Sequence, residues 1–356
     1  MRILKKILKI AGISLLVLIG VPLIIGQILR FTSNVEPPPG ELIDVGGYKL
    51  HINCVGPEGK NDERLPTVIF EAGAGVNSPV NHWIQDGISK ITKVCVYDRA
   101  GLGWSEESRL PRDAKTINTA LHTLLDKAKI KRPFVFAGHS IAGLYMRDYV
   151  ERYPGEVSGI AFLDPSHPEQ NKRFGLTDDQ RAEQMSTVNT IIFFAKILMK
   201  TGVMEVYNPA MAGDLTLYPE NIRKQLSFLS KNSSNLDTVL LETEDFEKAA
   251  AQAGQNKSLG DRPVVVISAT KKMDTTFLPE GVSAEKVQAA FINMHKEIAA
   301  LSIQGKHIEM DSADHMGLIT NKENAAKAVP HIIEVIQRSV RSEKSPDSEK
   351  TPVENN

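Results

Sequence analysis

Short apolar runs alternate with amphipathic stretches along most of this chain. Strand-like runs, mostly of the kind that is buried on both faces of a parallel sheet, occupy residues 66–70, 93–97, 133–137, 157–163, 263–268 and 306–310. Stretches with apolar residues at helical spacing lie between them, at residues 83–91, 116–128, 144–150, 284–301 and 324–340. This alternation predicts an α/β fold in which helices cover both faces of a mostly parallel sheet.

Two regions depart from the alternation. Near the start, residues 42–45 and 48–55 have strand character and are separated by a Gly-Gly pair, which is typical of a β-hairpin. Later, the chain between Pro165 and Asp261 has helical character but no strand of the buried type. We therefore expect a helical insertion there.

The N-terminal pattern differs from the rest of the chain. Four basic residues lie within positions 1–9, and residues 10–29 are then almost wholly apolar. A helix of about 20 apolar residues is long enough to cross the hydrocarbon core of a bilayer. No small-x-small cleavage site follows the run, so an uncleaved transmembrane anchor over residues 1–30 is favoured over a secretory signal. The basic residues before the span predict a single-pass protein of the cell membrane whose folded domain is extracytoplasmic.

The remaining boundaries follow from local composition. Residues 31–41 contain three consecutive prolines and are expected to form a short spacer. A single domain is expected over residues 42–340, with the helical insertion at about 166–261. Residues 341–356 are charged and rich in Pro and Ser, so they are expected to be a disordered tail.

Overall composition bears on partners and on cysteine chemistry. The 356 residues are 42% hydrophobic and carry a net charge of −1 without a basic stripe, so no nucleic-acid partner is expected. The chain has two cysteines, Cys54 and Cys95, each in a strand-like run. A disulfide becomes permissible if the domain lies outside the cytoplasm. Two buried free thiols are the alternative.

The strongest chemical signal is Gly-His-Ser-Ile-Ala-Gly at residues 138–143. An apolar run leads into it and a helical stretch leads out, which is the strand–turn–helix context of a nucleophile elbow. The small residues let backbone segments approach closely, and the sharp turn lifts the Ser140 hydroxyl clear of the sheet. The helix start directs free N–H groups at this position, where negative charge would develop. Ser140 is therefore the expected nucleophile; the alternative is a glycine-rich turn that only connects two elements.

These features resemble the α/β-hydrolase superfamily, in particular its bacterial-type serine hydrolases with a helical lid, over about residues 42–340. Residues 97–105, Tyr-Asp-Arg-Ala-Gly-Leu-Gly-Trp-Ser, are similar to the loop that follows strand four in many bacterial members. The resemblance implies an eight-stranded, mostly parallel sheet, and it identifies the helical insertion with the family's lid after strand six. It also makes strands two and four neighbours, which would bring Cys54 and Cys95 within disulfide reach.

Acyl transfer needs a general base beside the serine, because a serine hydroxyl is almost entirely protonated at neutral pH. Among nine histidines, the resemblance points to His315, which follows the last strand in Ser-Ala-Asp-His-Met-Gly. His139 is adjacent to Ser140 in the sequence but is expected to be a packing residue. The histidines show no metal-ligand spacing, so neither a metal nor a cofactor is expected.

The acid that would orient the histidine has two main candidates. Most family members carry it after strand seven, where Asp274 stands, and a minority carry it at the end of strand six, where Asp164 stands. Asp164 follows its strand directly and so lies on a rigid element, which favours it over Asp274. Asp311 and Asp314 are further alternatives, and either of the two main candidates could simply cap a helix or a turn.

The resemblance implies an oxyanion hole made by the backbone N–H groups of Ile141 and Ala74. At the second position the common His-Gly motif is replaced by Ala72-Gly73. Because the donors are backbone groups, this replacement does not abolish the hole. It does require other contacts to hold the loop, and Glu71 is a candidate.

Together these expectations describe a serine hydrolase that cleaves carboxyl esters through an acyl-enzyme. We expect it to act as a monomer on apolar or membrane-associated small molecules. A peptidase or amidase of the same fold is one alternative, although no acidic anchor for a substrate amine can be identified. A catalytically idle, membrane-tethered binding protein is another. Ser140 excludes a dehalogenase or epoxide hydrolase of this fold, because those enzymes require an aspartate at the elbow.

Overall fold

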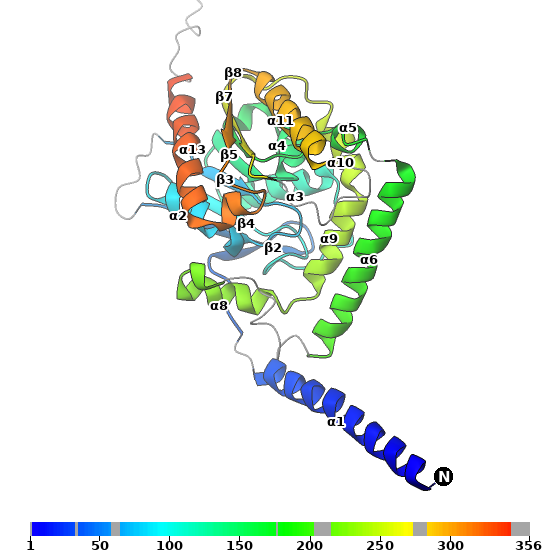
Figure 1. The fold of residues 1–356 in the computed structure, drawn as a ribbon. Helices are drawn as coiled ribbons and strands as arrows, with labels where there is room; N and C mark the ends of the chain where they lie inside the picture. The colour runs from blue at the N-terminus through cyan, green and yellow to red at the C-terminus, as the bar shows by residue number, and fades with distance from the viewer. Residues whose placement is uncertain are drawn as a thin grey trace, which may run out of the picture.

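One eight-stranded sheet forms the centre of the molecule (Figure 1). The computed structural model describes residues 2–32, 35–57, 65–175, 177–202, 215–272 and 283–342. The strands, in chain order, are β1 (Glu41–Asp44), β2 (Lys49–Val55), β3 (Val68–Glu71), β4 (Val94–Tyr97), β5 (Phe134–His139), β6 (Val157–Leu163), β7 (Gly260–Ala269) and β8 (Ser302–Met310). Their spatial order is β1-β2-β4-β3-β5-β6-β7-β8, with antiparallel pairing up to β4 and parallel pairing beyond it. The predicted α/β fold with a mostly parallel, eight-stranded sheet is confirmed.

Helices cover both faces of the sheet (Figure 1). One face carries α3 (Ala114–Lys127), α4 (Ala142–Arg152) and α11 (Ala284–Ala300), and the other carries α2 (His82–Ser89), α12 (Gly317–Thr320) and α13 (Lys322–Ser342). Consecutive residues of a strand point to opposite faces, so each strand contributes to both layers. In β5, for example, Phe134 and Phe136 pack with the first set of helices, whereas Val135 and Ala137 pack with the second. Burial on both faces explains why the strands read as continuous apolar runs.

A disulfide joins Cys54 on β2 to Cys95 on β4. The two residues face each other across the antiparallel β2–β4 pair, with Cα atoms 4.0 Å apart. The bond spans a sequence separation of 41 and encloses the whole of β3. The disulfide implied by the family resemblance is therefore confirmed, and the alternative of two free thiols is wrong.

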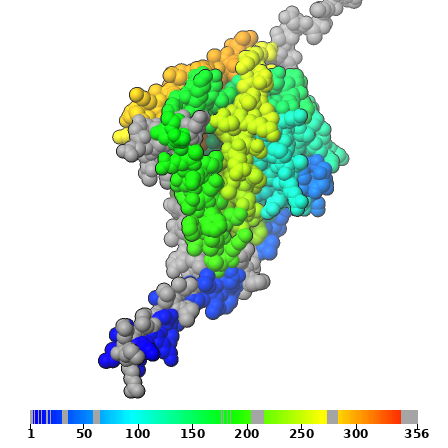
Figure 2. Space-filling view, turned by 90° about the vertical axis from the view of Figure 1, so that its right-hand side faces the viewer, coloured from blue at the N-terminus to red at the C-terminus, as the bar shows by residue number. Residues whose placement is uncertain are grey.

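The chain between β6 and β7 forms the predicted helical insertion. Its described helices are α5 (Gln170–Arg173), α6 (Asp178–Lys200), α8 (Glu220–Leu229), α9 (Ser234–Glu244) and α10 (Phe246–Ala253). Small apolar residues of α10 pack on α3 and α4, close to the turn that carries Ser140. The long helix α6 lies outermost, alongside α9 (Figure 2), and an ion pair joins Lys196 to Asp237 between them. That these helices act as a lid stays a prediction.

The N-terminal segment forms α1 (Arg2–Thr32), which projects away from the sheet domain (Figure 1). Its last turns reach the insertion, where the side-chain amide of Gln27 donates to the carbonyl of Lys200 (3.0 Å). Aliphatic side chains such as Ile10 and Ile24 are exposed along it. In the part of the chain that the structure describes, no helix is long and apolar enough to cross a membrane, so the predicted transmembrane anchor is not confirmed.

The proline-rich spacer is fastened to the domain. The Trp104 indole N–H donates to the carbonyl of Glu36 (3.0 Å), and the ring of His51 is hydrogen-bonded to the carbonyl of Pro39. Residues 35–40 of the spacer therefore lie against the domain, whereas Phe31 and Thr32 belong to α1 and Glu41 to β1. Residues 343–356, most of the predicted tail, lie outside the described residues.

Candidate active site

Ser140 stands in the turn between β5 and α4, the strand and helix that its sequence context predicts. Its φ angle of 60° lies in the left-handed region, which residues with a side chain rarely adopt. The Ser140 N–H donates to the carbonyl of Leu163 (3.1 Å), and its carbonyl accepts the N–H groups of Gly143 (2.9 Å) and Ser166 (2.7 Å). These bonds hold a strained turn of the kind that is typical of functional sites.

The glycines on either side of Ser140 are required by close packing. A Cβ at Gly138 would lie 2.7 Å from the Cβ of Ala142, and one at Gly143 would lie 2.6 Å from the Cβ of Pro165. Protein interiors do not tolerate contacts this short, so a larger residue at either position would move the turn. This explains the small residues around Ser140 in the sequence.

His315 and Asp164 form one connected arrangement with Ser140. His315 Nε2 lies 3.0 Å from Ser140 Oγ, and His315 Nδ1 lies 2.5 Å from Asp164 Oδ2. Asp164 directly follows β6 with a φ of 46°, and His315 lies in the loop between β8 and α12. Because β5, β6 and β8 all run parallel, their carboxyl ends reach the same edge of the sheet. The structure thus brings together three residues that are far apart in the sequence.

The surroundings of Asp164 keep its carboxylate ionised. The side chain is 12% exposed, and this burial by itself would raise its pKa. The hydrogen bond with His315, the favourable electrostatic interactions with His315 and His295, and the N–H of Ala269 (2.9 Å from Oδ1) outweigh burial, so the pKa of Asp164 lies below its ordinary value. An ionised carboxylate in this position can orient the imidazole of His315 and stabilise its protonated form.

A second histidine lies behind Asp164. His295 Nδ1 is 3.9 Å from Asp164 Oδ1, and His295 Nε2–H donates to the carbonyl of Pro165 (2.8 Å). Ser268 Oγ lies 2.7 Å from His295 Nδ1 and 2.7 Å from His307 Nε2. Since Nε2 of His295 is the donor, its Nδ1 accepts the Ser268 proton, and the Ser268 oxygen accepts from His307. This chain of hydrogen bonds, buried at Ser268 and His295, fixes the segment that carries Asp164.

The other acid candidates have different outcomes. Asp274 lies outside the described residues, so its position relative to His315 stays open. Asp314 caps a turn, because its Oδ1 accepts the N–H of Gly317 (2.7 Å). Asp311 is exposed. Of the candidates within the described ranges, Asp164 is the one that is hydrogen-bonded to the His315 ring.

His139, which the sequence analysis assigns to packing, also contacts the loop that carries His315. It is fully buried, its ring centroid lies 4.4 Å from that of His315, and its Nε2–H donates to the His315 carbonyl (2.9 Å). Burial, reinforced by the neighbouring His315, lowers the pKa of His139 to about 3. His139 is therefore neutral at physiological pH and holds the loop that carries His315.

The two expected oxyanion donors belong to the residue after Ser140 and to a loop that approaches Ser140. Ile141 follows it directly, and the oxyanion loop (residues 71–75, at the end of β3) approaches it, since a Cβ at Gly73 would lie 3.4 Å from Ser140 Cβ. Among the described residues, neither the Ile141 N–H nor the Ala74 N–H has a hydrogen-bond acceptor. Both groups are therefore available as hydrogen-bond donors, and their oxyanion role stays a prediction.

Arg99 holds the oxyanion loop. Its Nη1–H donates to the carbonyl of Ala72 (2.8 Å), and its Nη2–H donates to the carbonyl of Gly73 (2.7 Å). The guanidinium also pairs with Glu71 Oε1 (2.6 Å), and the other oxygen of that carboxylate accepts the Tyr97 hydroxyl. Burial raises the pKa of Glu71 above its ordinary value, although Arg99 and Tyr97 oppose the shift. Arg99, with Glu71 as its partner, thus supplies the support that the missing His-Gly motif leaves open.

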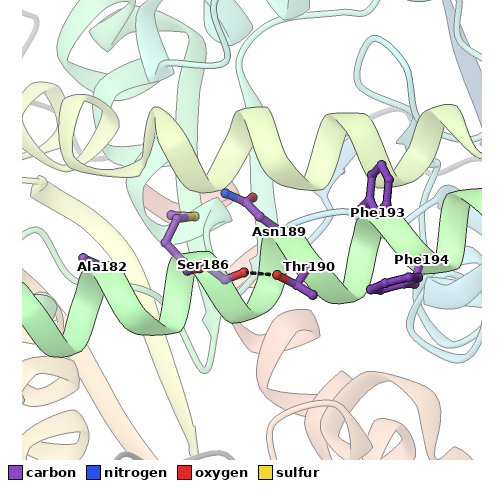
Figure 3. Close-up of a pocket in the computed structure, with 7 residues that line it drawn as sticks. Ala182, Ser186, Asn189, Thr190, Phe193 and Phe194 are labelled. Atoms are coloured by element: carbon purple, nitrogen blue, oxygen red, sulfur yellow. Dashed lines mark hydrogen bonds between the residues drawn. The ribbon is translucent and has the colours of Figure 1, made fainter.

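A hollow of about 740 Å³ lies along α6 (Figure 3). It is lined by Ala182, Met185, Ser186, Asn189, Thr190, Phe193 and Phe194. All seven residues come from this one helix, and none of them is Ser140, Asp164 or His315. We therefore do not assign this hollow to the reaction at Ser140.

Three residues near the site receive no role from the sequence analysis. Arg99 lies in the motif at 97–105. The Asp-Arg pair directly after a buried strand is the feature of the sequence that could have indicated a role for it. Glu242 and His295 lie on amphipathic helices and read as ordinary polar positions, yet both are 0% exposed. Within the described ranges, no three His, Cys, Asp or Glu side chains are grouped so that they could hold a metal ion.

Comparison with known proteins places this geometry in context. A profile of the alpha/beta hydrolase fold matches residues 66–321. An uncharacterised protein of Bacillus subtilis (strain 168) is 29% identical over 255 residues, which cover 68% of this chain and 75% of that one. Among solved structures, an enol-lactonase from Burkholderia xenovorans LB400 is 18% identical, with a TM-score of 0.54, and the match covers 83% of this chain and 100% of that one. The haloalkane dehalogenase DbeA from Bradyrhizobium elkani USDA94 is 14% identical, with a TM-score of 0.57 and coverage of 85% and 98%. At these identities the solved structures share the fold and do not identify the reaction.

Replacing Asp164 tests the choice of acid. If Asp164 orients His315, Asp164→Asn should lower kcat for an ester by about 10⁴, because an amide stabilises the wrong imidazole tautomer. Asp274→Asn should then have little effect and serves as the matched control. Steady-state kinetics of the two purified variants measure both effects, and the reverse ranking would identify Asp274 as the acid.

The buried, neutral His139 predicts acid sensitivity of the fold. Its pKa is about 3 in the native state and about 6.5 in the unfolded chain. Between these values the unfolded state binds a proton that the native state does not, so acidification lowers the free energy of unfolding by about 1.4 kcal/mol per pH unit. His139→Gln should remove this contribution while keeping an amide donor for the His315 carbonyl. Urea unfolding across this pH window measures both slopes, and equal slopes would contradict the prediction.

Proposed function

Since this chain belongs to the α/β-hydrolase fold family, we propose that it is a serine hydrolase that cleaves carboxyl esters. One observation carries the proposal: Ser140 Oγ lies 3.0 Å from His315 Nε2, and His315 Nδ1 lies 2.5 Å from Asp164 Oδ2. Nucleophile, base and orienting carboxylate are thus within hydrogen-bond reach of one another. A dehalogenase of the same fold would need an aspartate in place of Ser140.

The first half of the proposed reaction acylates Ser140. His315 Nε2 takes the proton from Ser140 Oγ as this oxygen attacks the ester carbonyl carbon. The negative charge of the tetrahedral intermediate lies on the former carbonyl oxygen, which accepts hydrogen bonds from the Ile141 and Ala74 N–H groups. The C–O bond to the alcohol then breaks, the protonated His315 gives its proton to the leaving alcohol, and Ser140 remains acylated. Asp164 stabilises the imidazolium during these steps.

The second half of the reaction uses water. His315 takes a proton from a water molecule whose oxygen attacks the acyl carbon, and collapse of the second tetrahedral intermediate returns a proton to Ser140 Oγ. The carboxylic acid then leaves. The His315 side chain is 47% exposed, so water can reach the base.

The charges around the site favour an ester over the substrate of an aminopeptidase. Binding a substrate amine requires an acidic side chain that is not already paired. The two buried carboxylates beside the oxyanion loop, Glu71 and Glu242, both pair with Arg99 at 2.6 Å. Neither is therefore free to bind an ammonium group, which supports a neutral substrate.

We also propose that α1 holds the hydrolase at a membrane, with the domain outside the cytoplasm. Ile10 and Ile24 of α1 are 63% and 62% exposed, and lysines lie at the N-terminal end of the same helix. Exposed aliphatic side chains next to a cluster of lysines are suited to contact with the acyl chains and headgroups of a lipid surface. The Cys54–Cys95 disulfide fits an oxidising compartment. Apolar esters that partition into lipid would then reach the site at high local concentration.

The location is tested on intact cells that express the full chain. We expect the protein to sediment with membranes and the domain to be digested by protease added from outside, with a cytoplasmic protein as the protected control. Recovery of the full chain in the soluble fraction would contradict attachment through α1. Complete protection until lysis would contradict the extracytoplasmic location.

The nucleophile is tested with a fluorophosphonate probe and a panel of esters of graded acyl length with their matching amides. The wild type should be labelled at Ser140 and should hydrolyse esters. Ser140→Ala should lose labelling and lower kcat by several orders of magnitude with an unchanged circular dichroism spectrum, because nucleophile and base act as one unit.

Other outcomes of this experiment would overturn the proposal. Retention of about a tenth of the wild-type kcat by Ser140→Ala would remove Ser140 from the mechanism. Folded wild-type protein that is neither labelled nor active would indicate an idle binding protein. Faster turnover of the amides than of the esters would indicate a peptidase or amidase.

A further inference from the structure

A glutamate from the helical insertion lies buried against the oxyanion loop. Glu242 belongs to the last turn of α9, and its side chain is 0% exposed. Burying a carboxylate is costly unless the charge is paired and hydrogen-bonded. An apolar residue would fill the same position without that cost, so the contacts of this carboxylate require an explanation.

Glu242 binds both the oxyanion loop and the residue that holds it. Its Oε2 accepts the Gly75 N–H (2.8 Å), its Oε1 accepts Arg99 Nε–H (2.6 Å), and its Oε2 also accepts Arg99 Nη2–H (3.1 Å). Arg99 in turn donates to two carbonyls of the loop. The backbone on both sides of Ala74 is therefore fixed by the Glu242–Arg99 pair, and so is the direction of the Ala74 N–H.

Helix α9 also packs closely on the loops around the site. Gly75 has a φ of +64°, and a Cβ there would lie 2.2 Å from Val239 Cγ2. Gly101 has a φ of +81°, and a Cβ there would lie 2.3 Å from Thr238 Oγ1. Only glycine fits at these two positions, because both the backbone angle and the space exclude a side chain. The position of α9 and the conformation of the oxyanion loop thus determine each other.

We propose that Glu242 is a positioning residue that makes the oxyanion hole depend on the docking of α9. With α9 in place, Glu242 and Arg99 fix the Ala74 N–H. With α9 displaced, Arg99 keeps Glu71 and the carbonyls of Ala72 and Gly73, but the Gly75 N–H loses its acceptor, so the loop is no longer fixed on the C-terminal side of Ala74. The inference rests on the proposed function, because it assigns a role in that reaction.

The test compares two glutamates of the same helix in the full-length protein. Glu242→Gln preserves the size of the buried side chain and removes its charge, and Glu244→Gln is the matched control because Glu244 is exposed. Glu242→Gln should lower kcat for an ester by about tenfold or more, towards the 10²–10³-fold loss typical of a removed oxyanion donor. KM should change little, because the loss falls on the transition state.

A transition-state analogue checks this assignment. A trifluoromethyl ketone forms an oxyanion when Ser140 Oγ adds to its carbonyl carbon, so its affinity should fall by the same factor as kcat in Glu242→Gln. Glu244→Gln should leave kcat, KM and this affinity unchanged. A role in stability alone would lower the melting temperature of Glu242→Gln and leave kcat and inhibitor affinity of the folded enzyme as in the wild type.

Hydrogen exchange separates this inference from the proposed function. The peptide that contains residues 72–76 should exchange faster in Glu242→Gln than in the wild type, whether or not the protein hydrolyses esters. Wild-type protein without ester turnover and without labelling would refute the proposed function, and exchange alone would then decide whether Glu242 fixes the loop. The inference would be overturned if folded Glu242→Gln exchanged this peptide at the wild-type rate. It would also be overturned if the wild type were active and Glu242→Gln had the same kcat.

A second variant covers failure of Glu242→Gln to fold. Val239→Ala shortens the side chain that packs on Gly75 without changing a buried charge. It should lower kcat and the affinity for the trifluoromethyl ketone by the same factor, and this factor should be smaller than in Glu242→Gln. It should also speed hydrogen exchange of the peptide that contains residues 72–76. If folded Val239→Ala exchanges this peptide at the wild-type rate, the inference is overturned. The same holds if the enzyme is active and Val239→Ala keeps the wild-type kcat.

Discussion

The buried guanidinium of Arg99 is the contact on which the shape of the site depends. An unpaired cation in the core would cost several kcal/mol, so the surrounding structure must supply acceptors. They come from Glu71 at the end of β3, from two carbonyls of the oxyanion loop and from Glu242 on α9. Burial by itself would lower the pKa of Arg99, but the two carboxylates raise it well above its ordinary value. Sheet, loop and insertion are thus arranged around one permanent charge.

The parallel sheet supplies the second constraint, because it brings strand ends that are distant in sequence to a common edge. Ser140 follows β5 with a φ of 60°, and Asp164 follows β6 with a φ of 46°. Such backbone angles persist only where neighbouring structure enforces them. Here the two turns are bonded to each other and to adjacent strands, since Ser140 binds Leu163 and the Asp164 N–H donates to Ile267. A rigid sheet edge therefore carries both residues in fixed positions relative to His315.

Local pattern was sufficient to predict the sheet, since strands buried on two faces leave continuous apolar runs. The sequence also identifies Ser140 as the candidate nucleophile, because its turn requires small neighbours at fixed positions. The roles of Arg99 and Glu242 cannot be predicted from the sequence, because their contact joins residues 143 positions apart. In addition, nothing in the periodicity of α9 marks Glu242 as buried. The helix at α1 was predicted, whereas its crossing of a membrane is not confirmed. The choice between Asp164 and Asp274 depended on loop geometry, which single-residue patterns do not encode.

The close fit of α9 against Gly75 has a consequence for how such a chain can diverge. An insertion between two strands usually changes freely, because the sheet does not rely on it. Here one inserted helix carries a charge whose partner stands on the sheet domain, and it approaches a loop position that admits only glycine. A chimera that replaced the insertion alone would leave Arg99 short of an acceptor and Gly75 without its neighbour. Positions 75, 99 and 242 are therefore expected to change together in evolution, and a chimera must take all three from the same parent.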